Sequence, residues 1–374
     1  MPPRPLSAIV LAAGGGTRMR SPLPKPLHRL CGRPMLLHVL DALAELPIER
    51  VVVVVGYRSS EVTKVLESEA PSELRLEFVE QSAALGTGDA TAVGLTGFPV
   101  GADLEEGDLV VLPGDTPLLR PATLAALVRT HRQEDAAATL LTARVEDPSG
   151  YGRVVRAKDG GVKKIVEHLD ASPEELAIDE VATSIYCFRH GVLAPALRRL
   201  TPTNAKGEVY LTDAIAVLDD AGYRVVTMPA GDPVEAAGVN DRAQLAAAEA
   251  VLRERINERF MRRGVTMTDP GATYIDVSVE IGEDVTILPG VVLEGQTRIA
   301  SGVHLGPGTH LSDCEVGEGA QVQQTRASHA VIGRDAVVGP YAVLDDGCRL
   351  ASGVVTGPFF RSSTTDVATL EGRP

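Results

Sequence analysis

The chain has 374 residues, a formal net charge of −14 and an apolar fraction of 44%. This length suggests two domains with ample buried cores, and the negative charge argues against nucleic acid or an anionic membrane as the main partner. No apolar run approaches the ~20 residues of a membrane span, and the N-terminus lacks a signal-peptide pattern. The four scattered cysteines follow neither a zinc nor a disulfide spacing, so we expect a cytoplasmic protein.

The stretch 11–25 predicts a phosphate-binding loop. An apolar run at 8–11 has the pattern of a buried strand, and three glycines follow it at 14–16. Without Cβ atoms these glycines let the backbone turn sharply and direct several N–H groups at one point, which suits a polyphosphate. Arg18 and Lys25 add two cations. The run alone would equally fit an ordinary glycine-rich turn, and neither the dinucleotide fingerprint nor the Gly-Lys-Ser/Thr phosphate loop matches it.

Strand-like and helical segments alternate from residue 11 to about residue 240. The apolar spacing predicts helices at 34–46 and 123–131 and fully buried strands at 50–56 and 109–112. This alternation implies a mainly parallel sheet with helices on both faces. Ligands of such folds bind over the carboxyl ends of the strands.

Asp115 follows the predicted strand at 109–112 within a glycine-containing turn. An acid in that position is well placed to hold Mg²⁺ through oxygen. A turn-forming aspartate without a ligand is the alternative. Because Gly14 and Gly56 also follow predicted strands, we expect these residues and Asp115 to converge.

Two further segments are candidates for ligand contact. Gln81 and the glycine-opened turn at 85–88 would let backbone approach a base or a ribose, although a helix N-cap at Thr87 explains the turn as well. The segment 150–168 has the pattern of a β-hairpin. Glu167 at its end would accept a hydrogen bond from a sugar hydroxyl, or would be an ordinary strand-end charge.

A long helix is predicted at 241–263, closed by Gly264, and it either links two domains or packs within the first. Aliphatic residues then recur every six positions. This period predicts short strands stacked as flat coils with their aliphatic side chains inside, which is a hexapeptide β-helix. The repeat positions are Ile275, Ile281, Ile287, Leu293, Ile299, Leu305 and Leu311, then Val316 and Val322, and then Ile332, Val338, Leu344 and Leu350.

These patterns divide the chain into four parts. We expect an α/β domain at 1–240, a helical linker at 241–264, a β-helix at 265–361 and a polar tail at 362–374.

Several short motifs fall in a specific order along the chain: LAAGGGTRM with Pro24-Lys25, LGTG, PGD, GYGR, VEH, YLTD at 210–213 and GVN at 238–240. In this order they resemble the sugar-phosphate nucleotidylyltransferases. The resemblance is to the bacterial bifunctional N-acetylglucosamine-1-phosphate uridyltransferase/glucosamine-1-phosphate acetyltransferase family in particular, and it covers residues 6–361.

The resemblance implies an α/β fold: a Rossmann-like nucleotidyltransferase domain at 1–240 with a mostly parallel sheet, followed by a short left-handed parallel β-helix. It also implies Mg²⁺-dependent transfer from UTP to N-acetylglucosamine 1-phosphate, giving UDP-N-acetylglucosamine and pyrophosphate for cell-wall synthesis. A homotrimer formed through the β-helix is implied as well. The alternatives are the same chemistry on another sugar phosphate or nucleotide, and a paralogue that binds without turnover.

Site residues follow from the resemblance position by position. It implies catalytic roles for Arg18 and Lys25, and a metal site of Asp115 and Asn240. Contacts to the nucleotide or sugar are implied for Leu11, Ala12, Ala13, Gly14, Lys25, Gln81, Gly86, Thr87, Gly114, Gly152, Glu167 and Asn240, with Gln81 at the uracil edge.

The chain departs from the family pattern at two places. Pro113 stands where the family usually has a tyrosine or another polar residue, and the triplet 182–184 (Ala-Thr-Ser) replaces an Asn-x-Gly that contacts the sugar nucleotide. Losing such an amide costs about 1–3 kcal/mol if nothing replaces it. Thr183 or Ser184 would have to compensate.

The family's acetyl-transfer site lies further along the β-helix. This chain matches the family only as far as Arg361, so we expect acetyl transfer to be lost and the β-helix to serve structure and trimerisation. The histidines of the repeat are interpreted as surface residues at coil corners rather than as an acyl-transfer base: His304, His310 and His329.

Overall fold

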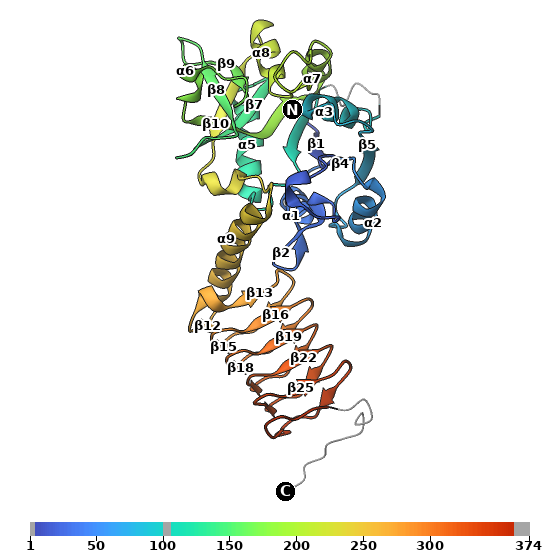
Figure 1. Ribbon diagram of the computed structural model, residues 1–374, viewed down its shortest axis with the longest axis vertical. Coiled ribbons are helices and arrows are strands. Elements are labelled where there is room, and N and C mark those ends of the chain that lie inside the picture. The colour runs from blue at the N-terminus through green and yellow to red at the C-terminus, as the bar shows by residue number, and fades with distance from the viewer. Residues whose placement is uncertain (1–3, 100–105, 363–374) are drawn as a thin grey trace. The chain divides into compact units, whose positions relative to one another are not determined.

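The computed structural model describes residues 4–99 and 106–362. The chain divides into two compact units (Figure 1). The first unit holds the chain as far as Leu245 except for residues 29–33. The second holds residues 29–33 and the chain from Ala246 onward.

The first unit is built on one nine-stranded sheet. Its main path has the order β11-β7-β10-β6-β1-β4-β5, and the hairpin of β8 and β9 branches from β10. The strands are β1 (Leu6–Leu11), β4 (Arg50–Val55), β5 (Leu76–Glu80), β6 (Asp108–Pro113), β7 (Ala138–Arg144), β8 (Gly152–Arg156), β9 (Val162–Val166), β10 (Glu180–Arg189) and β11 (Val225–Pro229). Along the main path all neighbours are parallel except β10, which runs antiparallel to β6 and β7. The predicted mostly parallel sheet and the hairpin at 150–168 are confirmed.

Helices cover both faces of this sheet. One face carries α1 (Met35–Ala44), α2 (Ser59–Glu69) and α5 (Pro121–Gln133), and the other carries α3 (Thr87–Leu95), α7 (His190–Leu197) and α8 (Asp213–Asp220). The short α6 (Pro173–Leu176) follows β9 and begins with a capping box at Ser172. Short 3-10 helices lie at Thr17–Met19, Lys25–Leu27, Pro233–Ala236 and Pro270–Ala272.

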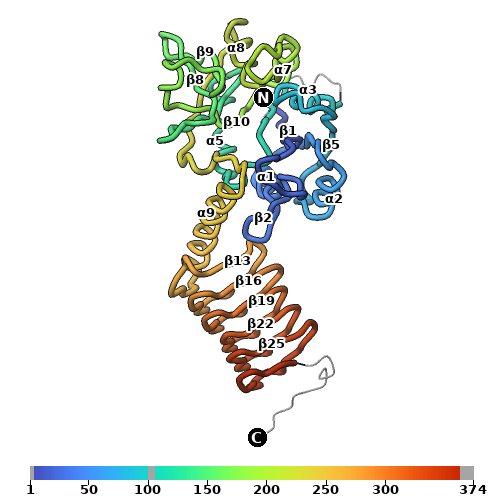
Figure 2. The backbone as a smooth tube through the Cα atoms, viewed as in Figure 1, coloured from blue at the N-terminus to red at the C-terminus, as the bar shows by residue number. Residues whose placement is uncertain are grey.

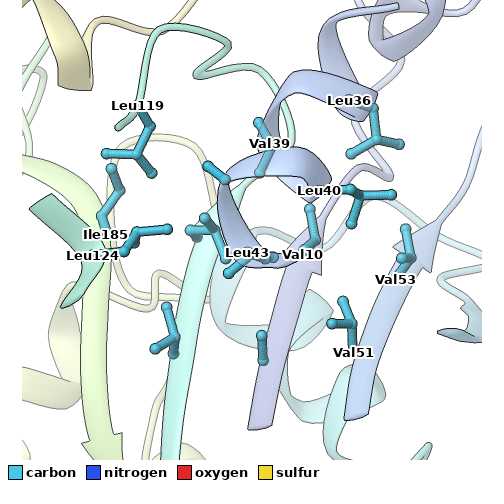
Figure 3. Packing of buried hydrophobic residues seen from close by; sticks show 14 of the residues in the cluster. Val10, Leu36, Val39, Leu40, Leu43, Val51, Val53, Leu119, Leu124 and Ile185 are labelled. Carbon is cyan, nitrogen blue, oxygen red and sulfur yellow. The ribbon is translucent and has the colours of Figure 1, made fainter. Parts of the chain in front are cut away.

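The core explains why the β-branched runs form the central strands. The side chains of β4 from Val51 to Val55 are almost completely buried, since the sheet has a helix layer on each side. Figure 3 shows Leu40 and Leu43 of α1 lying over Val10 and Val53, and burying a leucine side chain contributes about 1.5–3 kcal/mol.

The second unit is a left-handed parallel β-helix. The six-residue period predicts its stacked coils, and the family resemblance implies its handedness. Its coils follow one another along the chain in Figure 2, and α9 (Arg242–Met261), which begins in the first unit, contributes Ile256 and Phe260 to its core. Three five-stranded parallel sheets form its sides. They are β12 (Thr266–Met267), β15 (Thr286–Ile287), β18 (His304–Leu305), β21 (Gln321–Val322) and β24 (Val337–Val338); β13 (Tyr274–Ile275), β16 (Val292–Glu294), β19 (His310–Ser312), β22 (Arg326–Ser328) and β25 (Val343–Leu344); and β14 (Glu280–Ile281), β17 (Arg298–Ile299), β20 (Glu315–Val316), β23 (Val331–Ile332) and β26 (Arg349–Leu350).

The breaks in the six-residue period are shortened sides of the coil. Leu311 and Val316 are five positions apart, and Ala327 is a buried position midway between Val322 and Ile332. Strand β22, which holds Ala327, still pairs in register with β19 and β25. The repeat therefore continues through the break with an alanine in place of a larger aliphatic residue.

Residues 29–33, the tip of the small hairpin of β2 (Arg29–Leu30) and β3 (Arg33–Pro34), belong to the second unit. The carbonyl of Cys31 accepts from the N–H of Val277, and the N–H of Cys31 donates to Glu249 at 2.8 Å. Gly32 has a φ of +80°, and a Cβ there would lie 2.3 Å from the Asp276 carboxylate, so only glycine fits.

No helix in the described ranges combines the length and the apolar character needed to cross a membrane.

Candidate active site

A pocket of about 560 Å³ in the first unit brings the predicted site residues together. It lies at the carboxyl ends of β1 and β6, where ligands of such sheets bind. The predicted residues on its wall are Leu11, Ala12, Ala13, Gly14, Arg18, Lys25, Gln81, Gly86, Thr87, Gly114, Asp115, Glu167 and Asn240. Gly152 does not line it. A Cβ at Gly152 would lie 3.5 Å from the Glu167 carboxylate, so this glycine sits behind Glu167.

Lys25 is the central cation of the pocket. Its ammonium donates to the carboxylate of Asp115 and, at 2.9 Å, to the amide oxygen of Asn240. Arg18 donates to the same Asn240 oxygen, also at 2.9 Å. Asp115 follows the end of β6, and Asn240 precedes the first residue of α9. These two elements therefore place a carboxylate oxygen and an amide oxygen beside the Lys25 ammonium.

The chemistry of this pair fits Mg²⁺. Carboxylate and amide oxygens are ligands that Mg²⁺ accepts, and here both already face a positive charge, that of Lys25. Among the described residues no group of three His, Cys, Asp or Glu side chains could hold a metal. Asp115 and Asn240 would therefore hold Mg²⁺ together with substrate phosphates and water, as is usual for this ion.

The glycine loop leaves open space where phosphates would lie. A Cβ at Gly14 or Gly15 would meet nothing within 4 Å. Gly16, with a φ of +60°, instead lies directly against the Lys25 side chain, and Gly56 lies against the backbone of Ala13. The loop is thus fixed on one side by close packing and open on the other. The expected convergence is confirmed, since Gly14 and Asp115 line one pocket and Gly56 contacts the residue before Gly14.

Gln81 lines the same pocket in an orientation fixed by its hydrogen bonds. Its side-chain NH₂ donates to Asp89 at 2.7 Å and to the carbonyl of Gly86 at 3.2 Å, which leaves its amide oxygen to accept. The Thr87 hydroxyl accepts from the N–H of Leu211 at 3.0 Å and does not cap α3, whose N-cap is Gly86. The helix-cap explanation of Thr87 is therefore wrong.

Glu167 marks another part of the wall. Its carboxylate accepts from the Thr212 hydroxyl at 3.0 Å, and burial raises the pKa of Glu167 above its ordinary value. Burial and the charge of Asp115 likewise raise the pKa of Tyr151, so this phenol is a neutral donor in the pocket.

The departing triplet 182–184 lies in the first half of β10. Thr183 is buried and its hydroxyl donates to the carbonyl of Leu141 at 2.8 Å, so it is already engaged. Ser184 is exposed, lines the pocket and has a φ of +61°, a left-handed conformation that favours glycine. The regular pairing of β10 with β7 is interrupted between Ala182 and Tyr186. Of the two residues expected to compensate for the missing amide, only Ser184 has a side chain free to do so.

Comparison with known proteins identifies the family. Residues 8–264 match the family model described as a MobA-like NTP transferase domain. The chain is 48% identical to the Bifunctional protein GlmU of Thermobifida fusca over 330 residues, which cover 88% of this chain and 68% of that protein. This chain belongs to the GlmU family. GlmU of Mycolicibacterium vanbaalenii is 45% identical over 98% of this chain. GlmU of Streptomyces coelicolor is 44% identical over 97% of this chain. Each alignment covers 74% of the relative's own length.

Membership of the GlmU family makes the protein a nucleotidyltransferase, in agreement with the pocket. Four further residues line this pocket that the sequence does not predict as site residues: Tyr151, Tyr186, Lys206 and Thr212. Thr212 lies within the YLTD motif, and this motif could have indicated it as a site residue. Tyr186 lies in an apolar strand, where no motif distinguishes it from the core residues around it. The β-helix histidines His304, His310 and His329 are not buried, and His310 pairs with Glu294 at 2.7 Å, in keeping with their interpretation as surface residues.

Proposed function

We propose that this protein transfers a uridylyl group from UTP to N-acetylglucosamine 1-phosphate in a Mg²⁺-dependent reaction that gives UDP-N-acetylglucosamine and pyrophosphate. The observation that carries the proposal is the junction of Lys25, Asp115 and Asn240 in one pocket with the glycine loop. We further propose that the reaction takes place in the cytoplasm and supplies precursors of the cell wall.

In the reaction, a phosphate oxygen of the sugar 1-phosphate attacks the α-phosphorus of UTP. The new P–O bond forms as the bond to the β-phosphate oxygen breaks, and pyrophosphate leaves with its electron pair. Such a transfer needs two anions held in line and their charge neutralised, with little covalent help from the protein. Lys25, Arg18 and the amides of the glycine loop supply positive charge at the phosphates. When bound by Asp115 and Asn240, Mg²⁺ adds further neutralisation.

Gln81 supports a preference for uracil as the base. Because Asp89 and Gly86 occupy its NH₂ group, the Gln81 amide oxygen presents only an acceptor to the ligand. The N3 position of uracil is a donor, whereas N3 of cytosine is an acceptor. This arrangement therefore favours uracil over cytosine at the same position.

Glu167 is suited to bind a hydroxyl of the sugar phosphate. A buried carboxylate that already accepts from Thr212 suits a sugar hydroxyl as its second donor. The change at Ala182 and the proline at Pro113 favour a second candidate, the same transfer to a different sugar phosphate. A paralogue that binds without turnover is disfavoured, since binding alone would not require the oxygen pair of Asp115 and Asn240.

Pyrophosphate release by the purified protein tests this proposal. We expect release that requires Mg²⁺, UTP and N-acetylglucosamine 1-phosphate together. Release with another sugar phosphate only would favour the second candidate, and silence across a panel of sugar phosphates and nucleotides would favour the binding paralogue.

The second unit has a proposed role as a trimerising element. A β-helix buries its aliphatic residues inside and presents flat strand faces outward, so copies can pack side by side. Sedimentation equilibrium tests this, and a mass of 39.4 kDa, that of one chain, would contradict it. The predicted loss of acetyl transfer has no support from the comparisons and forms no part of the proposal.

A further inference from the structure

Tyr186 has a buried hydroxyl that no protein group satisfies. Its side chain is 1% exposed and its hydroxyl oxygen has no hydrogen-bond partner among the described residues. Proteins rarely leave a buried hydroxyl unpaired, because the group loses its bonds to water and gains none in return. Yet Tyr186 is also part of the wall of the active-site pocket. Because the pocket adjoins the Tyr186 side chain, a ligand that packs against this wall is the candidate partner for its hydroxyl.

The strand and its neighbours fix the position of this phenol. On β10, Ile185 and Cys187 pack on the sheet face that α1 covers, and Tyr186 and Phe188 pack on the opposite face. The Tyr186 ring stacks on the Phe188 ring with centroids 5.4 Å apart and an angle of 25° between the planes. Burial and this stacking fix the plane of the Tyr186 ring.

The surroundings show which kind of ligand group fits. Burial, and secondarily the charge of Glu167, raise the pKa of Tyr186 well above its ordinary value, so the phenol stays protonated and donates. Glu167 is an acceptor that lines the same pocket. A group that accepts from Tyr186 while donating to Glu167 must be both acceptor and donor. A sugar hydroxyl is such a group.

We propose that the Tyr186 hydroxyl donates a hydrogen bond to one hydroxyl of the bound sugar phosphate and so helps to select the sugar. This assignment rests on the proposed function. A site built to bond a particular hydroxyl discriminates strongly against an analogue that lacks it, because the buried protein group is then left unpaired. Tyr186 would thus be a specificity-determining residue beside the altered triplet at 182–184.

The test compares Tyr186→Phe with the wild type and with Tyr223→Phe, a matched change at an exposed tyrosine outside the pocket. Pyrophosphate release is measured with N-acetylglucosamine 1-phosphate and with its 3-, 4- and 6-deoxy analogues. We expect Tyr186→Phe to lower kcat/KM for the parent sugar about tenfold. For one deoxy analogue, the variant and the wild type should be equal.

The melting temperature provides the second readout. Since the hydroxyl bonds no protein group, Tyr186→Phe should not lower it. Equal kcat/KM for wild type and variant on every sugar would overturn the assignment. So would a uniform loss on all analogues together with a lower melting temperature, which would mean a structural role or a bound water. If the wild type released no pyrophosphate with any of these sugars, that result would instead overturn the proposed function.

Discussion

The ammonium of Lys25 donates to the amide oxygen of Asn240 at 2.9 Å, across 215 positions of sequence. The same ammonium bonds the carboxylate of Asp115. One side chain from the loop after β1 thus occupies the point between the two oxygen ligands proposed for Mg²⁺. Because the carboxylate and the ammonium have opposite charges, each holds the other in place.

Replacing Asp115 with alanine should remove Mg²⁺-dependent turnover. The carboxylate is the only charged member of the proposed oxygen pair, so we expect pyrophosphate release to fall at least about a hundredfold. Asp220→Ala, at the exposed end of α8, is the matched control and should keep full activity. An Asp115 variant with full activity and an unchanged circular dichroism spectrum would remove Asp115 from the metal site.

Lys25→Met should slow the chemical step more than it weakens UTP binding. Lys25 is placed to neutralise charge that develops as pyrophosphate leaves, and removing one such group typically costs about 10²–10³ in kcat. Steady-state kinetics with varied UTP separate kcat from KM. A rise in the KM for UTP with kcat unchanged would mean that Lys25 contributes binding only.

Protonation of Glu167 should make the KM for the sugar phosphate depend on pH. Burial raises its pKa, so it becomes protonated at a higher pH than an exposed glutamate would. Once protonated, Glu167 is a weaker acceptor than the carboxylate and one of its oxygens carries a proton, so the KM for the sugar phosphate should rise as the pH falls through this raised pKa. The KM for UTP should stay constant. Glu167→Gln should abolish this pH dependence of the KM. If the variant kept the pH dependence, another group would be responsible for it.

The same shift has a consequence for stability. The protonated form of Glu167 is favoured in the folded state, so its contribution is present below the ordinary glutamate pKa and is lost as the pH rises through the raised value. Urea titrations at several pH values should therefore show Glu167→Gln gaining free energy of unfolding relative to the wild type with increasing pH.

Ser184 offers a matched pair of variants. Its φ of +61° is unfavourable for any residue with a Cβ, so Ser184→Gly should raise the free energy of unfolding by about 1 kcal/mol, whereas Ser184→Ala should not. Both changes remove the hydroxyl that faces the pocket and should raise the KM for the sugar phosphate. An unchanged KM in both variants would show that Ser184 does not replace the missing amide.

The β-helix core should be sensitive at its inward positions only. Leu305 is completely buried, and Leu305→Ala should lower the free energy of unfolding of this unit by about 2–5 kcal/mol. His304→Ala, one position away with a partly exposed side chain, should change it by no more than about 0.5 kcal/mol. Thermal unfolding resolved by unit is the measurement, and equal effects of the two changes would contradict the inward placement.

Much of this architecture could be predicted because the signals are local. The glycines at 14–16, the valines at 51–55 and the six-residue period depend on neighbouring residues only. The direction of β10 could not be predicted, since a buried strand has the same apolar pattern whether its neighbours are parallel or antiparallel. Neither could the place of residues 29–33 in the second unit, because their contacts are long-range.

The sequence predicts candidate site residues where the residue type itself indicates the chemistry. Asp115 after a strand was recognisable for that reason. The folded chain determines which atoms lie within hydrogen-bonding distance of one another. This is why the Thr183 hydroxyl bonds the Leu141 carbonyl, and why the Tyr186 hydroxyl has no partner among the described residues. No sequence pattern encodes those contacts.

Pyrophosphate release by the purified protein with Mg²⁺, UTP and a panel of sugar 1-phosphates tests the central claim most directly. The account predicts release that needs all three components and is fastest with N-acetylglucosamine 1-phosphate. Absence of release with every sugar phosphate and every nucleotide, from protein whose fold is intact, would contradict it.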